Sequence, residues 1–127
     1  MTRVLLIGYA PEAVDFSDPA LPPDMDAEKI ATGIRLGLEQ MRHRGWEADF
    51  CSIEPNDQAA AIVSQQLASA AYDCVVIGGG VRLASKGLTI FEAVINAVRE
   101  AAPHTPIAFN TRPDDSADAA ARWLRSK

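Results

Sequence analysis

Apolar and polar residues alternate in blocks along the chain, and these blocks predict four strand–helix pairs. Residues 3–8 (RVLLIG) and 74–78 (CVVIG) are short apolar runs that end in glycine, as expected of strands buried on both faces. Residues 106–110 (PIAFN) form a similar run. Residues 46–53 (WEADFCSI) instead place Trp, Ala and Phe opposite Glu and Asp, which is typical of a strand with one exposed face at a sheet edge.

The segments between these strands show apolar residues at helical spacing. Residues 27–44 predict a helix with Asp24 or Asp26 as its N-cap. Gly33 and Gly37 lie on one face of that helix and allow close approach to a neighbouring element. Three further helices are predicted: one over residues 57–71, one from Leu88 to Val98 with Thr89 and Glu92 as a capping box, and one capped by Asp114, Asp115 or Ser116.

A strand–helix unit repeated four times predicts an α/β fold. The expected architecture is three-layer α/β/α, a single domain over residues 1–127 with a four-stranded parallel sheet and right-handed crossovers. An alternating second strand suits the edge of strand order 2-1-3-4. This order and spacing resemble the flavodoxin-like superfold, here lacking a fifth strand. The fourth strand then becomes an exposed edge without charge, so we expect a homo-oligomer, most simply a dimer, through this edge or the Trp123 side of the last helix.

Charge and composition narrow the classes of partner. The formal net charge is −5, with 12 acidic and 5 basic side chains in residues 1–78 and 5 acidic and 7 basic in residues 79–127. A chain without a basic stripe is not expected to bind nucleic acid. Its longest apolar runs are too short to span a bilayer, and no signal peptide is recognisable, so we predict a cytoplasmic protein without a membrane partner. Cys51 and Cys74 are expected to be buried, unpaired thiols.

The segment 78–87 (GGGVRLASKG) is the most suggestive stretch of the chain. It follows the third strand, at the carboxyl edge where parallel sheets bind ligands. Consecutive glycines expose backbone N–H groups, and arginine and lysine side chains bind carboxylates or phosphates. We therefore predict a site for a small anionic ligand. Its candidate residues are Gly78, Gly79, Gly80, Arg82, Lys86, Asn110 and Arg112, with Tyr9 as the aromatic residue at the same edge.

An alternative reading of the glycine segment is a tight exit from a buried strand. The order Ser85-Lys86-Gly87 does not match a Walker loop, and Leu83 stands where a dinucleotide fingerprint needs glycine. Asn110 can cap its own turn, and Arg112 can pair with Asp114 or Asp115. The sequence leaves the anion site and the structural turn both open.

Residues 9–26 form a long, acidic, proline-rich connection that leaves the same edge. The aspartates of this segment are placed to close over the basic residues as an electrostatic lid, or to wrap as a stiff surface loop. They lack the spacing of a calcium loop, so no metal is expected, and no cofactor is predicted. His43 and His104 lie away from Ser85, so no nucleophile–base pair can be assembled.

Resemblance adds little about activity. A flavodoxin has a hydroxyl-rich phosphate loop after its first strand, where this chain has GYAPEAVD. A response-regulator receiver has a phosphoacceptor aspartate closing its third strand, where this chain has Ile77 and Gly78. The phrases GGGVRL, EAVIN and FNTRPDDSADAAARWL resemble those of a group of small uncharacterised bacterial proteins, a resemblance that implies no activity. An enzyme using Tyr9, Ser85 or Asn110, and an interaction module or degenerate receiver-like domain without a ligand, remain alternatives.

Overall fold

A computed structural model describes residues 1–124 and confirms the predicted α/β fold. Its sheet is parallel throughout, with strand order β2-β1-β3-β4. The strands are β1 (Arg3–Tyr9), β2 (Glu47–Ile53), β3 (Cys74–Ile77) and β4 (Ile107–Phe109). All four point their carboxyl ends toward the same edge, because parallel strands share one direction.

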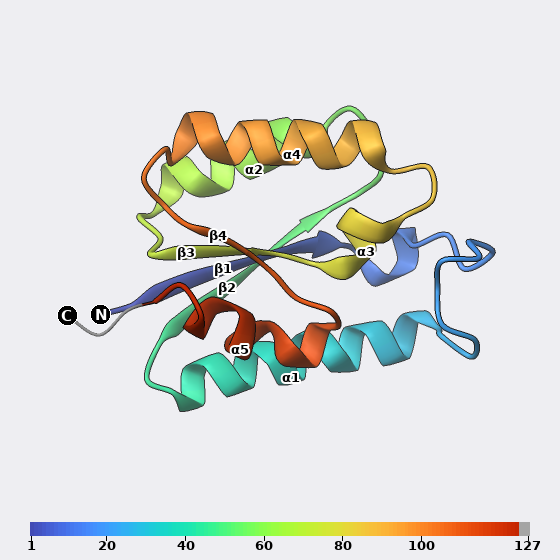
Figure 1. The fold of residues 1–127 in the computed structure, drawn as a ribbon, viewed down its shortest axis with the longest axis horizontal. Coiled ribbons are helices and arrows are strands. Elements are labelled where there is room, and N and C mark those ends of the chain that lie inside the picture. Colours follow the sequence, from blue (N-terminus) through green and yellow to red (C-terminus); the bar gives the residue numbers. More distant parts are fainter. Residues whose placement is uncertain (125–127) are drawn as a thin grey trace.

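Helices cover both faces of the sheet (Figure 1). On one face lie α2 (Ala59–Ser69) and α4 (Leu88–Ala101), and on the other lie α1 (Ala27–His43) and α5 (Ser116–Ala121). Two short 3₁₀ turns, η1 (Pro11–Ala13) and η2 (Pro113–Asp115), interrupt the long connections. The side chain of Asp26 accepts from the N–H of Lys29 (2.8 Å) and caps α1, as predicted. No helix among residues 1–124 is long and apolar enough to cross a membrane.

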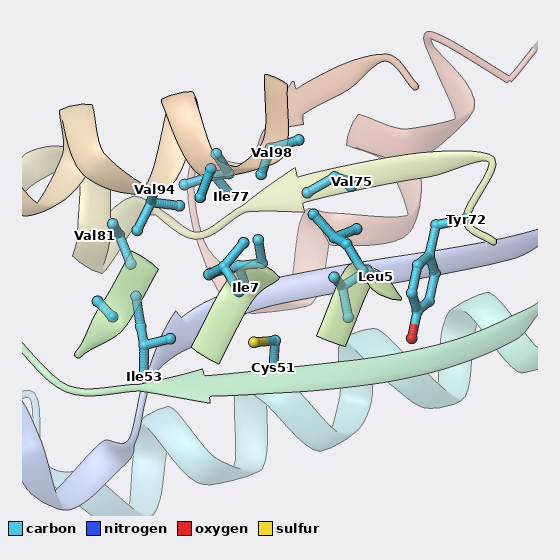
Figure 2. Close-up of a cluster of buried hydrophobic side chains, with 14 of the residues drawn as sticks. Leu5, Ile7, Cys51, Ile53, Tyr72, Val75, Ile77, Val81, Val94 and Val98 are labelled. Carbon is cyan, nitrogen blue, oxygen red and sulfur yellow. The ribbon is translucent and has the colours of Figure 1, made fainter. Parts of the chain in front are cut away.

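Two buried clusters hold the layers together, one on each face of the sheet. Alternate residues of β1 belong to different clusters. Leu5 and Ile7 face α2 and α4, whereas Val4 and Leu6 face α1 and α5. Figure 2 shows the first cluster, in which Val81 packs beneath α4 with Val94. Because burying each such side chain contributes about 1.5–3 kcal/mol, this alternation fixes the strand register.

The helix α1 contacts η2 closely at its two glycines, as predicted. A Cβ added at Gly37 would lie 2.5 Å from the backbone oxygen of Pro113, and one added at Gly33 would lie 3.1 Å from Cβ of Pro113. The glycines are therefore explained by packing, and they set how closely the β4–α5 connection approaches α1.

Three local predictions are wrong in detail. The second face of β2 is not simply exposed, because Cys51 and Ile53 are buried on it beyond Glu47 and Asp49. The helix α4 begins at Leu88 with Gly87 as its N-cap and no side-chain cap, so Thr89 does not form a capping box. Finally, part of the expected glycine loop is a short helix, α3 (Gly79–Leu83).

A side chain that follows α5 makes a hydrogen bond to the outer edge of β4. Arg122, just after α5, donates from Nη2 to the backbone oxygen of Phe109 (2.9 Å). The strand is three residues long, and Ala108 is fully buried against α5 rather than exposed at the edge. Short edge strands and charged side chains act against sheet extension, and the dimer expected at this edge stays a prediction.

Candidate functional site

The glycine segment makes a tight turn directly after β3. The N–H of Gly78 donates to the backbone oxygen of Ile7 (2.8 Å), and the N–H of Gly79 donates to Oδ1 of Asn110 (2.7 Å). A Cβ at Gly78 would lie 3.2 Å from the Ile7 oxygen, so the turn passes too close to β1 for a side chain to fit without a shift. Two of the three glycine N–H groups are therefore already paired inside the protein.

Asn110 is the centre of a buried polar network. It is 2% exposed, accepts from Gly79, and donates from Nδ2 to the hydroxyl of Ser116 (2.8 Å). That hydroxyl donates in turn to the backbone oxygen of Pro113 (2.7 Å). Because buried polar groups need partners, this network fixes the exit of β3 against the β4–α5 connection.

Arg82 points toward β4 rather than into solvent. Its Nη2 donates to the backbone oxygen of Asn110 (2.9 Å), and its guanidinium lies 5.9 Å from the ring centre of Phe109. Its Nε is buried and, within residues 1–124, has no hydrogen-bond partner. The side chain thus reinforces the network around Asn110, and only part of the guanidinium remains for another acceptor.

Arg112 is an exposed residue that pairs within its own turn. Its Nε donates to Oδ1 of Asp114 (2.8 Å), one of the two partners that the sequence suggested. The neighbouring Asp115 accepts from the hydroxyl and the N–H of Thr111. Burial raises the pKa of Asp115, but the hydrogen bonds from Thr111 and Arg112 outweigh it and leave that pKa below its usual value. Arg112 therefore belongs to a structural turn.

Tyr9 is buried beneath the carboxyl edge, with 7% of its surface exposed. Its hydroxyl is enclosed and lacks a partner among the described residues, and burial raises its pKa above the usual value. The ring packs in the same apolar cluster as Ile53 and Val81. Stacking on a ligand from this position is not available without a rearrangement, so the structure makes Tyr9 an anchor for the start of the long connection.

A carboxylate is bound at the far end of the glycine segment, and it belongs to the protein itself. The N–H of Ser85 donates to Oδ2 of Asp18 (2.8 Å), and the hydroxyl of Ser85 donates to Oδ1 of the same group. These hydrogen bonds, hydroxyl first, lower the pKa of Asp18, and the charge of Lys86 lowers it further. The contact joins residues 67 positions apart and brings the acidic connection onto the loop between α3 and α4 (Figure 1).

The start of α4 lies immediately beyond this contact. The helix has 14 residues, and its N-cap, Gly87, offers no side chain to its free N–H groups. The positive end of a helix dipole favours negative charge within the first turn. Ser85, Lys86 and the uncapped start of α4 thus follow one another along the chain, and all three favour an anion.

The eight candidate residues are not brought together as one open site. Gly78, Gly79, Asn110 and Arg82 form one internal network, Arg112 lies in a separate turn, and Tyr9 is buried. Gly80 and Lys86 remain exposed. The pairing of Ser85 with Asp18 was missed, because no sequence pattern links residues so far apart, although the sequence did suggest that the acidic segment closes over this edge.

Two hollows in the protein surface lie elsewhere. One, of about 490 Å³, is lined by α1 residues such as His43 and by Asp118, and the other, of about 470 Å³, lies between the carboxyl ends of α2 and α4. None of the eight candidate residues lines either of them. Within residues 1–124, no group of three or more histidine, cysteine or acidic side chains is placed to hold a metal ion.

Comparison of the chain with protein-family models, curated proteins and solved structures found no match. The resemblance to a group of small bacterial proteins therefore stays a prediction. The geometry of the carboxyl edge is therefore the basis for assigning a function.

Proposed function

We propose that the protein binds a small anionic molecule carrying a carboxylate at the loop between α3 and α4. The observation that carries this proposal is the Asp18 carboxylate, which lies on the N–H and the hydroxyl of Ser85. We interpret that side chain as an internal counterpart of a ligand carboxylate. The site is shifted from the glycines themselves to Ser85 and Lys86, a few residues further along the same segment.

The donors at this loop suit a carboxylate in shape and charge. Ser85 supplies two donors, one to each carboxylate oxygen, which is the paired arrangement that gives geometric selectivity for a planar anion. Lys86 supplies a positive charge beside them, and the uncapped start of α4 adds the favourable end of a helix dipole. Hydrogen bonds to a charged group are stronger than those between neutral groups, so two such bonds beside a positive charge support a measurable affinity.

The remaining candidate residues support the site indirectly. The Asn110 network fixes Gly79, and with it α3, to which the binding loop is attached. The contact between Ser85 and Asp18 does not favour the alternative that this edge is an enzyme active site. The hydroxyl of Ser85 donates to a carboxylate whose pKa is lowered, and a weaker base is a poorer activator of a nucleophile.

Nuclear magnetic resonance of the ¹⁵N-labelled protein tests this function. Succinate, acetate and phosphate are titrated separately at constant ionic strength, so that general screening by salt does not change. We expect the amide signals of Ser85 and Lys86 to shift saturably with succinate, and less with phosphate, whose shape is tetrahedral. In the Asp18→Asn background, where no internal carboxylate competes for Ser85, Lys86→Gln should weaken binding at least threefold, because it removes the neighbouring charge.

The matched control is Arg99→Gln, which removes the same charge from an exposed position on α4. It should leave succinate affinity unchanged. Equal weakening by both variants, or shifts spread over the whole surface, would indicate general electrostatic attraction and contradict a site at Ser85.

The homo-dimer is a separate proposal, supported by apolar exposure beside β4. Leu88 is 70% exposed, Leu83 is 52% exposed and Phe109 is 37% exposed. Phe109 packs against Phe91 of α4 with ring centres 6.1 Å apart, which places it beside the helix that Leu88 begins. Since Arg122 occupies a carbonyl of the strand edge, we assign the contact between two copies to these side chains rather than to strand pairing.

A further inference from the structure

We propose that residues 10–26 are a tethered competitor, whose Asp18 carboxylate fills the anion site until a ligand displaces it. This inference rests on the proposed function, because it concerns the regulation of the same site. Ligand binding then releases the acidic connection from the loop between α3 and α4. Ligand binding therefore changes the surface of the protein beside this loop, because the acidic connection no longer covers it.

The middle of the connection is held to distant parts of the protein by few hydrogen bonds, so its release breaks few contacts. Among the described residues, the contacts between Asp18 and Ser85 are the only hydrogen bonds that join residues 11–24 to a distant part of the chain. Its other hydrogen bonds are local, such as those from Ser17 to Asp15 and from Ala20 to Asp18. Phe16 is 42% exposed, so this apolar residue does not fix the segment to the core.

The two ends of the connection are better fixed than its middle. The N–H of Ala10 donates to the oxygen of Ile53 (2.8 Å), and Val14 packs against the buried cluster. At the other end, Asp26 caps α1. Lys29 of α1 also donates from Nζ to the backbone oxygen of Asp24 (2.6 Å). Residues 15–23 lie between the two fixed ends, and Asp18 lies within that stretch.

Competition follows from the chemistry of the contact. A ligand carboxylate and the Asp18 carboxylate need the same two donors of Ser85, so they cannot occupy the site together. A ligand that binds only when the site is free shows an affinity reduced by the free fraction. If Asp18 occupies the site in about nine molecules of ten, removing it should tighten binding about tenfold.

The experiment compares succinate affinity in the wild type, in Asp18→Asn and in Glu12→Gln, by the same amide titration. Asp18→Asn removes the competing charge with little change in shape, and we expect it to bind succinate three- to tenfold more tightly. Glu12→Gln removes one negative charge from the same connection without touching Ser85. It should bind succinate as the wild type does, which separates competition from a change in local charge.

A second measurement follows the motion of the connection directly. The heteronuclear ¹H–¹⁵N NOE of Ala20 and Leu21 reports nanosecond motion of the connection. In the wild type it should fall as succinate saturates Ser85, and in Asp18→Asn it should be low from the start. A saturable shift at Ser85 with equal affinities in wild type and Asp18→Asn, and an unchanged NOE, would overturn the competitor while leaving the anion site in place. No saturable shift at Ser85 in any variant would overturn the anion site itself.

Discussion

The side-chain oxygen of Asn110 accepts a hydrogen bond from the N–H of Gly79 (2.7 Å), across 31 positions of the chain. This contact decides between the two readings of the glycine segment. An N–H group that already donates to a buried amide is not free to hold a phosphate. Gly78 and Gly79 therefore make the strand exit, and the anion site that we propose lies at the end of the segment, at Ser85.

The Asn110 network should contribute strongly to stability. Asn110→Ala leaves the N–H of Gly79 and the hydroxyl of Ser116 without their partner, and an unsatisfied buried group costs about 1–3 kcal/mol. We expect the free energy of unfolding, measured by urea denaturation, to fall by about 2–3 kcal/mol. In a double-mutant cycle with Ser116→Ala, the two losses should be less than additive. Full additivity would show that the two side chains do not act together.

The surroundings of Gly37 in α1 and of Gly80 in α3 predict opposite outcomes for their replacement by alanine. Gly37→Ala improves helix propensity by about 1 kcal/mol, but its Cβ would lie 2.5 Å from the oxygen of Pro113. Overpacking of this kind costs about 1–3 kcal/mol, so we expect a net loss of stability in thermal denaturation. The control is Gly80→Ala, where nothing lies within 4 Å of the new Cβ and stability should be retained or increased. A stable Gly37→Ala variant would contradict the close packing of α1 on η2.

The two cysteines should be inert in the folded protein. Burial raises the pKa of both Cys51 and Cys74 to about 11, with Asp73 adding to the effect at Cys74. At pH 8 the thiolate fraction of such a group is about 0.1%, far below that of a free thiol. A thiol reagent such as DTNB should therefore react slowly with the native protein and rapidly in 6 M guanidinium chloride. Because these pKa values are higher in the folded than in the unfolded state, the thiols should also reduce stability as the pH rises through the unfolded pKa, near 8.5–9. Rapid native reaction of either cysteine would show that its strand is not covered as described.

The proposed dimer can be tested at Leu88. Leu88→Lys places a charge on an exposed apolar position without disturbing the core, and we expect sedimentation velocity to show a shift toward monomer. A substitution within β4, such as Ala108→Lys, would not test the edge, because Ala108 is fully buried and its replacement should unfold the protein. A dimer that persists in Leu88→Lys would place the contact on another surface, such as the exposed Trp123.

The fold could be predicted from sequence because its signals are local. Continuous apolar runs predicted β1 and β3, and the spacing of glycines predicted the close approach of α1 to a neighbour. The site could be predicted only to the level of the sheet edge. The partners of Asn110, Arg82 and Ser85 depend on contacts between residues 28 to 67 positions apart, which no local pattern specifies. The hydrogen bond from Arg122 to the edge of β4 was not predicted either, because it is also a tertiary contact.

The proposal that Ser85 binds a carboxylate is tested most directly after the internal carboxylate of Asp18 has been removed. Succinate is titrated into Asp18→Asn and into Asp18→Asn/Ser85→Ala, and the amide of Lys86 is followed in both. We predict saturable binding in the first variant and at least threefold weaker binding in the second, because Ser85→Ala removes one of the two donors to the ligand carboxylate. Ser64→Ala, an exposed substitution on α2, in the same Asp18→Asn background should have no effect. Equal affinities with and without the Ser85 hydroxyl would contradict the claim.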